Sequence, residues 1–129
     1  MGEKHKEQTS AAAFDFELFK AQFDGEGAFS DMVDLLLREL PKELEEFRAA
    51  YQIKNWNVIQ NLAHRLKGGI TYCGATPLKR ACAQLEKAIE GQKYGLFEHL
   101  YDQLVAEILL AEKTLKENWS LEKQQISVA

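Results

Sequence analysis

His64 and Lys67 are the residues of this sequence whose types and spacing best suit a chemical reaction. In a helix, residues three positions apart lie on one face, so the ammonium group of Lys67 can approach whatever the imidazole of His64 holds. An accessible imidazole is a nucleophile at neutral pH. A cation beside it stabilises anionic oxygens, such as those of a phosphoryl group. The pair therefore predicts a histidine that takes part in phosphoryl transfer.

Two adjacent glycines, Gly68 and Gly69, follow this pair and need an explanation. A glycine inside a helix costs about 1 kcal/mol relative to alanine. Helical side chains lean over the preceding turn, so a side chain at position 68 would cover His64. We therefore expect Gly68 to keep the imidazole accessible to a bulky incoming group. Gly69 points toward a flank of the helix, where we expect it to permit close approach of a neighbouring helix.

A helical wheel of the surrounding segment predicts that His64 faces solvent. At about 100° per residue, the apolar side chains between Ile59 and Cys73 cluster in one direction and form a buried stripe. His64 lies nearly opposite that stripe, which disfavours a histidine buried in the core. The residues that flank His64 on the exposed face are Gln60, Asn61, Lys67, Gly68 and Thr71.

The segments that must position this motif are all predicted to be helical, because apolar residues recur every three or four positions and no segment alternates with period two. Pro41 lies inside the second pattern, where it should kink the helix or force a restart. Gly74 should end the third helix, Thr76 should cap the fourth, and Pro77 suits its first turn. The expected helices cover about 14–23, 29–51, 56–73, 76–90 and, for the last, at least 96–115. The apolar stripe of the fourth consists of Leu78, Ala81, Cys82, Leu85, Ala88 and Ile89, and that of the last consists of Leu96, Leu100, Leu104, Ile108, Ala111 and Leu115.

The links between these helices are short, so consecutive long helices should be antiparallel neighbours. The expected fold class is all-α, an antiparallel up-and-down four-helix bundle with a short extra N-terminal helix. A chain of 129 residues suits one such domain. We place it at 13–119, after a disordered lead-in or cloning remnant at 1–12 and before a frayed tail at 120–129.

Charge, cysteine spacing and missing motifs exclude several classes of function. The net charge of −4, with acidic and basic residues interleaved, argues against nucleic acid as a partner. No apolar run is long enough to span a bilayer, and we expect no direct membrane contact. Cys73 and Cys82 match no zinc or redox spacing, so both should be buried. Neither His64 nor His99 has a second histidine or cysteine at i+3 or i+4, so no metal site is expected. No phosphate-binding loop is present.

The segments AHRLKGG (63–69), YCGATPL (72–78) and CAQLEKAI (82–89) resemble the histidine-containing phosphotransfer (HPt) domain of bacterial phosphorelays. The match to its A-H-x-L-K-G core is complete, and the later glycine and Leu-Glu pair also fit. Upstream, the segment 35–64 follows the family pattern of a long helix with a proline and a short turn before the histidine helix. The resemblance covers about residues 14–117.

The resemblance implies that His64 carries a phosphoryl group on the ring nitrogen farther from the backbone. Lys67 would neutralise the phosphoryl charge, and Gly68 would give access. In some members of the family a glutamine on the following helix binds the other ring nitrogen, and by position that residue is Glu86 here. A carboxylate there either fixes the tautomer and keeps the ring more basic, or simply faces solvent.

The resemblance also implies the partners. Receiver domains of response regulators would supply the phosphorylated aspartate and the Mg²⁺ ion, so the chain needs no cofactor of its own and should not autophosphorylate from ATP. Because it carries a phosphoryl group without autonomous catalysis, it would count as an enzyme only as part of a histidine kinase. As an isolated domain it should be a monomer. The expected contact residues for a receiver are Gln60, Asn61, Arg65, Lys67 and Thr71.

Context leaves alternatives open. The chain is either a free-standing protein or, as we favour, the C-terminal module of a bacterial hybrid sensor histidine kinase; both readings place it in the cytoplasm, the second tethered to the inner membrane through its parent. The alternative function is a helical adaptor that binds receiver domains without phosphorylation. A relative that has lost transfer is disfavoured by the intact Lys67-Gly68 pair. A metal-dependent enzyme using His64 with His5 or His99 is the weakest alternative.

Overall fold

The computed structural model describes residues 13–23, 25–71 and 73–128, and for Glu26 and residues 118–128 it describes the backbone alone. The expected lead-in at 1–12 lies outside the described residues. This part of the chain is all helical and contains no strand. The helices are α2 (Phe16–Ala21), α3 (Glu26–Gln52), α4 (Trp56–Gly69), α5 (Thr76–Glu90) and α6 (Tyr94–Val128).

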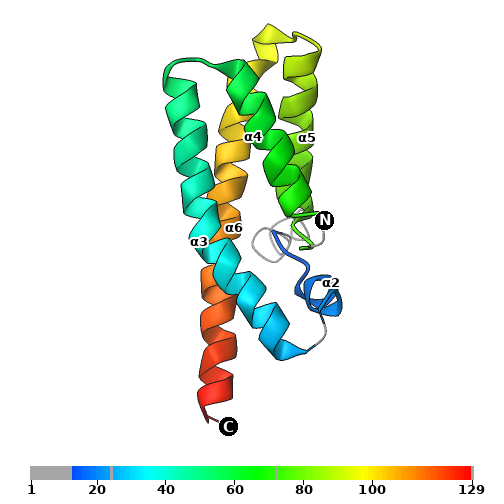
Figure 1. Cartoon of the computed structure of the whole chain (residues 1–129), viewed down its shortest axis with the longest axis vertical. Coiled ribbons are helices and arrows are strands. Elements are labelled where there is room, and N and C mark those ends of the chain that lie inside the picture. Colours follow the sequence, from blue (N-terminus) through cyan, green and yellow to red (C-terminus); the bar gives the residue numbers. More distant parts are fainter. Residues whose placement is uncertain (1–12, 24, 72, 129) are drawn as a thin grey trace, which may run out of the picture.

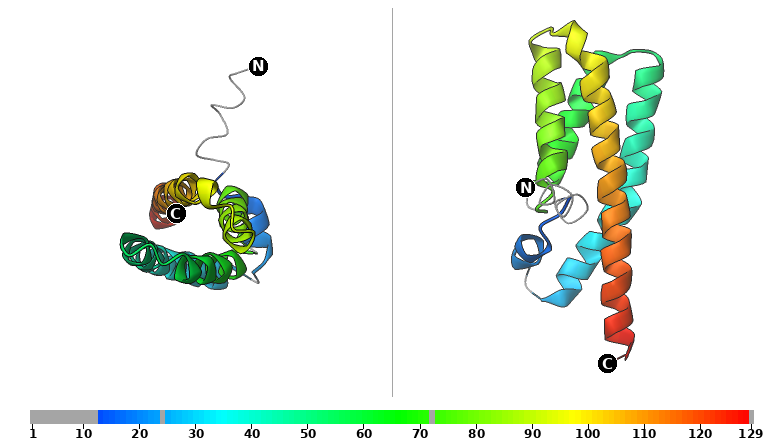
Figure 2. Two further views of the ribbon diagram at one scale, coloured as in Figure 1. Left: turned by 90° about the horizontal axis from the view of Figure 1, so that it is seen from above. Right: turned by 180° about the vertical axis from the view of Figure 1, so that it is seen from behind.

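The four long helices form the antiparallel bundle that the short links predict (Figure 1). Each packs against two others, in the cyclic order α3, α4, α5, α6. The view from above in Figure 2 shows this arrangement, and the short α2 packs against α3 at the end of the bundle where α4 meets α5. The buried face of α5 is the one the periodicity predicts, made of Leu78, Ala81, Cys82, Leu85, Ala88 and Ile89.

Helix α3 runs through Pro41 without interruption. Proline cannot donate a backbone hydrogen bond and crowds the preceding turn, so a bend is expected at such a position. Figure 1 shows α3 changing direction about half-way along its length. The alternative of a restarted helix is therefore wrong, and the second half of α3 follows α4 closely enough to exchange side-chain contacts with it.

Helix α4, which carries His64, is shorter than the sequence predicts. It begins after Asn55, whose side chain accepts a hydrogen bond from the backbone N–H of Val58 at 3.2 Å. It ends at Gly69 rather than at Cys73. Two adjacent glycines at the end of a helix disfavour its continuation, which explains the earlier stop. Cys73 is nevertheless buried in the turn that follows.

The turn between α4 and α5 depends on Gly74. This residue has φ +72°, and a β-carbon there would lie 2.6 Å from the backbone oxygen of Asp15. The backbone N–H of Asp15 also donates to the carbonyl of Gly74 at 2.9 Å. Only glycine suits both the conformation and the close approach. The sequence predicts that Thr76 caps α5, and this prediction is wrong, because Ala75 occupies the N-cap position and makes no side-chain hydrogen bond. Pro77 lies in the first turn of α5, as expected.

Helix α6 corrects one predicted core position. Leu96 is 49% exposed, whereas Phe97 and Tyr101 are buried in its place. Aromatic packing explains why these two residues are buried in place of Leu96. The ring centroids of Trp56 and Phe97 lie 4.9 Å apart, and the rings of Tyr51 and Tyr101 stack with their centroids 4.1 Å apart. The backbone of α6 remains helical to Val128, including most of the segment for which the sequence predicts a frayed tail.

Both cysteines are buried and unpaired, as the sequence predicts. Burial raises the pKa of the Cys73 thiol to about 11 and that of the Cys82 thiol to about 12. Neither thiol ionises near neutral pH, so both act as small apolar residues. No helix in the described part of the chain combines the length and apolar character that crossing a membrane requires.

Candidate phosphorylation site

His64 lies on the outer face of α4, with its side chain 71% exposed. Its neighbours Leu62, Ala63 and Leu66 point into the core, so the register of the helix directs the imidazole outward. The exposure that the helical wheel predicts is therefore confirmed.

The carboxylate of Glu86 on α5 holds both chemical groups of the motif. Its Oε2 lies 2.6 Å from Nδ1 of His64, and its Oε1 accepts a hydrogen bond from Nζ of Lys67 at 2.8 Å. The side chains of Glu86 and Lys67 are only 20% and 29% exposed. Of the two alternatives for Glu86, the structure has the one in which its carboxylate reaches the ring.

This contact determines which ring nitrogen is available. Burial raises the pKa of the Glu86 carboxyl, but the hydrogen bonds from Lys67 and His64 outweigh burial and hold the pKa below its ordinary value. Glu86 is therefore a carboxylate at neutral pH and can only accept hydrogen bonds. Nδ1 of His64 is then the donor, so in the neutral ring the free lone pair is on Nε2, in a side chain that is 71% exposed.

The surroundings of Gly68 agree with the role expected for it, whereas those of Gly69 do not. Both are exposed, and a β-carbon at either position would meet no described atom within 4 Å, the backbone of its own helix aside. At Gly68 this open space fits the expected access to His64. At Gly69 it contradicts the expected close approach of a neighbouring helix, because no described element lies near enough to require glycine there.

The sequence model of the Hpt domain matches residues 31–114, which include His64, Lys67, Gly68 and Glu86. This chain belongs to the Hpt domain family. The family thus confirms the resemblance on which the sequence analysis depends, and the helical bundle is the fold it implies.

Two known proteins place this Hpt domain among its relatives. Over 84 residues it is 30% identical to the sensor histidine kinase GacS of Pseudomonas protegens; the match covers 60% of this chain and 9% of the kinase. Its fold is similar to the crystal structure of histidine-containing phosphotransfer protein B (HptB) from Pseudomonas aeruginosa PAO1. That similarity has a TM-score of 0.73 and 21% identity, and covers 84% of this chain and 95% of the other.

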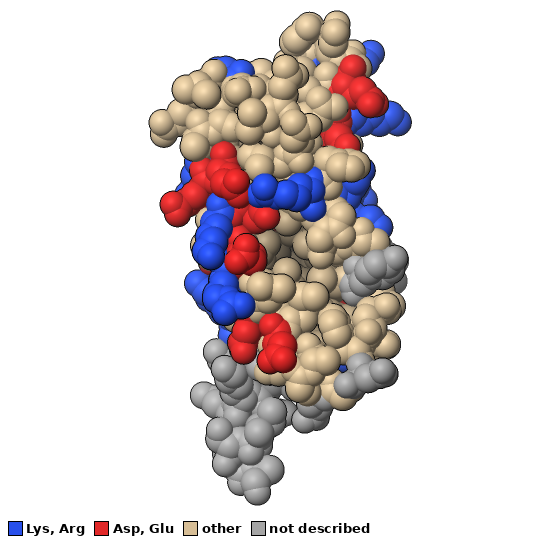
Figure 3. Space-filling model, in the orientation of Figure 1, with Lys and Arg blue, Asp and Glu red and all other residues tan. Residues whose placement is uncertain are grey.

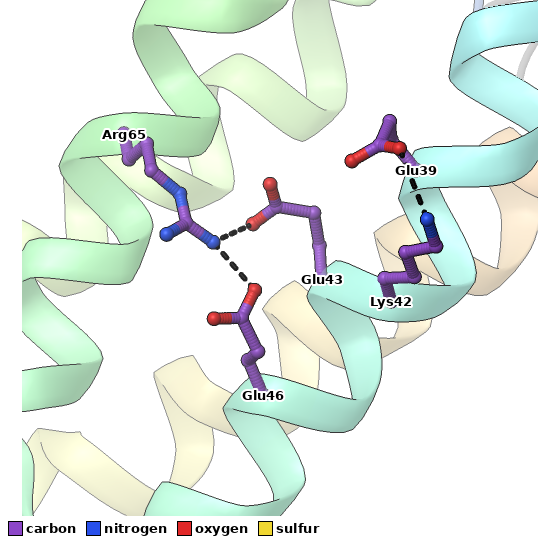
Figure 4. A network of polar contacts seen from close by, with 5 residues as sticks. All are labelled: Glu39, Lys42, Glu43, Glu46 and Arg65. Carbon is purple, nitrogen blue, oxygen red and sulfur yellow. Dashed lines mark hydrogen bonds and ion pairs between the residues drawn. The ribbon is translucent and has the colours of Figure 1, made fainter.

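The remaining expected contact residues of the Hpt domain differ in their surroundings. Asn61 is exposed and Gln60 is half-buried on the same helix. The hydroxyl of Thr71 donates to the backbone carbonyl of Lys67 at 2.9 Å and so stabilises the last turn of α4. Arg65 binds two carboxylates of α3, Glu43 and Glu46, and the sequence pattern gives no indication of this contact (Figure 4).

The surface around the site carries both signs of charge. Figure 3 shows acidic and basic side chains close together along the side formed by α3, while the upper end of the same face carries few charges. Within the described residues, no group of three or more histidine, cysteine or acidic side chains could hold a metal ion. His5, one of the ligands considered above, lies outside them.

The lowered pKa of Glu86 has a consequence for stability. A carboxyl whose pKa is lower in the folded state stabilises the fold above its ordinary pKa of 4.5, and this contribution is lost as the pH falls through the folded value. We expect Glu86→Gln to lower the free energy of unfolding by about 1 kcal/mol at pH 7 and by progressively less below pH 4.5. Urea unfolding from pH 7 to pH 3 measures the difference. Glu90→Gln, an exposed position one turn further along α5, is the control; a difference that stays constant with pH would contradict the assignment.

Proposed function

We propose that this Hpt domain is a phosphorelay intermediate that accepts a phosphoryl group on Nε2 of His64 from the aspartate of a receiver domain and passes it to a response regulator. Hpt domains act as phosphotransfer intermediates in two-component signalling, and the family membership of this chain carries that general role. The single observation that supports His64 is the contact of its Nδ1 with Glu86 in a side chain that is 71% exposed, which leaves Nε2 for the reaction.

The proposed step is an in-line displacement at phosphorus. The Nε2 lone pair forms the N–P bond while the P–O bond to the receiver aspartate breaks, and that aspartate leaves as a carboxylate. The proton on Nδ1 stays in its hydrogen bond to Glu86, so the positive charge that develops on the ring faces an anion. Onward transfer reverses the same bonds. The Mg²⁺ ion of the reaction would belong to the receiver.

Lys67 would change partner during this reaction. In the unphosphorylated protein its ammonium group binds Glu86. A phosphoryl group on Nε2 brings further negative charge to the same face, and the flexible lysine side chain can turn toward it. We therefore infer that Lys67 stabilises the phosphoryl oxygens and that Glu86 holds it in place between transfers.

The wider context is also proposed. Similarity to a sensor histidine kinase over a small share of its length supports a module of a larger hybrid kinase. In that setting the domain would act in the cytoplasm, as a monomeric unit that meets one receiver at a time. Transient contacts of this kind bury less than about 1,200 Å² in total.

A transfer assay tests the proposal. A receiver domain labelled with radioactive phosphate is mixed with the purified chain, and label is followed by gel. We expect label to appear on this chain in a bond that is stable in alkali and labile in acid, as an N–P bond is, and ATP alone to give none. Binding of the receiver without transfer of label would instead favour the adaptor function.

A further inference from the structure

Arg65 follows His64 directly and ties α4 to α3. A single guanidinium nitrogen, Nη2, donates to Glu43 at 2.9 Å and to Glu46 at 2.6 Å, and Figure 4 shows both carboxylates converging on it. The side chain of Glu43 is only 17% exposed. A carboxylate so placed needs a partner, because removing it from water without one is costly.

A second ion pair connects the opposite side of α4 to a neighbouring helix; we call these two interhelical ion-pair contacts the ties of α4. Lys67 binds Glu86 on α5. Arg65 and Lys67 are two positions apart, which is about 200° around a helix, so the two ties leave α4 in nearly opposite directions. Around the helix, His64 lies between these two directions, about 100° from Arg65 and about 60° from Lys67, and it is exposed. Together the ties resist rotation of α4 about its own axis.

These ion pairs matter because the last turn of α4 has a low helix propensity. Gly68 and Gly69 disfavour helix, and a β-carbon at either would meet no described neighbour beyond its own helix, so the exposed side of the turn after His64 has no packing of its own, while Leu66 and Ile70 on the other side are buried. Phosphoryl transfer needs the reacting atoms about 3 to 3.5 Å apart and in line. A small rotation of α4 would misplace Nε2 by enough to slow the reaction.

We propose that Arg65 is a positioning residue for phosphoryl transfer, which acts through Glu43 and Glu46 by fixing the rotation of α4. This inference rests on the proposed function, and it differs from the expectation that Arg65 contacts the receiver. The residues drawn in Figure 4 are three carboxylates and two cations, a net charge of −1, so this flank offers little attraction to an acidic receiver surface.

A mutant cycle separates the two roles. The variants are Arg65→Gln, the pair Glu43→Gln with Glu46→Gln, and all three changes together. Single-turnover transfer is measured over a range of phosphorylated-receiver concentrations, which gives a maximal rate and a half-saturating concentration. We expect Arg65→Gln to lower the maximal rate about fivefold, with the half-saturating concentration changed less than twofold. The triple variant should be no slower than Arg65→Gln, because all remove the same tie.

Other outcomes would overturn the proposal. A higher half-saturating concentration for Arg65→Gln that persists in the Glu43→Gln, Glu46→Gln background would make Arg65 a docking residue. A lower melting temperature with unchanged transfer would make the tie merely structural. Lys42→Gln is the control, because Lys42 pairs with Glu39 on α3 itself and does not reach α4; it should transfer at the normal rate.

A readout independent of transfer keeps this inference distinct from the proposed function. The ¹⁵N chemical shifts of the His64 ring report the Nδ1 hydrogen bond to Glu86. We expect Arg65→Gln to move them toward those of a ring that samples both tautomers, and Lys42→Gln to leave them unchanged. Unchanged shifts in Arg65→Gln would overturn the positioning role, even if the wild-type chain accepts no phosphoryl group.

Discussion

Replacing His64 with glutamine should abolish phosphoryl transfer and leave the fold intact. The amide nitrogen of glutamine has a delocalised lone pair and is not a nucleophile, so no N–P bond can form. The side chain is 71% exposed and contributes no core packing, and glutamine can still donate to Glu86. We expect label transfer from the receiver to fall more than about a thousandfold, to the background of the assay, with a melting temperature close to that of the wild type.

The matched control is His99→Gln. His99 is an exposed histidine on α6, so its replacement removes the same chemical group from another helix of the bundle. It should accept label at the wild-type rate. Transfer that survives in His64→Gln, or that disappears in His99→Gln, would move the phosphorylated residue away from α4 and contradict the proposed function.

The position of His64 could be predicted because it depends on local periodicity. In an amphipathic helix, the apolar residues alone determine which direction faces the core. The stripe that includes Ile59, Leu62 and Leu66 is buried, and His64 opposite it is exposed. The same reasoning gave the buried face of α5. It also gave the antiparallel order of the four long helices, since short links leave few other arrangements.

Contacts between helices could not be predicted in the same way. Periodicity gives the face on which Arg65 lies but not which side chains of α3 stand beside it, so its pairing with Glu43 and Glu46 depends on how far one helix slides along the other. The same limit left Glu86 with two alternatives, and only the packing of α5 on α4 brings its carboxylate to His64.

Two glycines show the limit most clearly. A glycine in a sequence indicates either a special backbone conformation, a close approach or an open surface, and the sequence does not distinguish these. Gly74 meets the backbone of Asp15, a contact between segments far apart in the chain. Gly69 was expected to make such a contact and has open space instead.

Replacing Gly68 with glutamine should slow phosphoryl transfer strongly without weakening the fold. A β-carbon at position 68 meets no described atom within 4 Å beyond its own helix, so the change needs no repacking. Glutamine favours helix over glycine, so the free energy of unfolding should rise by up to about 1 kcal/mol. Its side chain would lie over the preceding turn, across the exposed ring of His64. We expect the transfer rate to fall at least about tenfold, because an approaching receiver aspartate must displace that side chain before the in-line geometry is reached.

Gly68→Ala and Gly69→Gln separate screening of the ring from other effects. Alanine adds a single methyl group and should slow transfer much less than glutamine does. Gly69 is exposed in the same turn and equally free of described neighbours, but it is about 140° from His64 around the helix. Gly69→Gln should therefore gain similar stability and keep most of its transfer rate. A comparable loss of transfer rate in both glutamine variants would show that docking needs a flexible end of α4 or one without side chains, and would contradict screening of the ring. Full activity in Gly68→Gln would remove the steric reason for glycine beside the phosphorylated histidine.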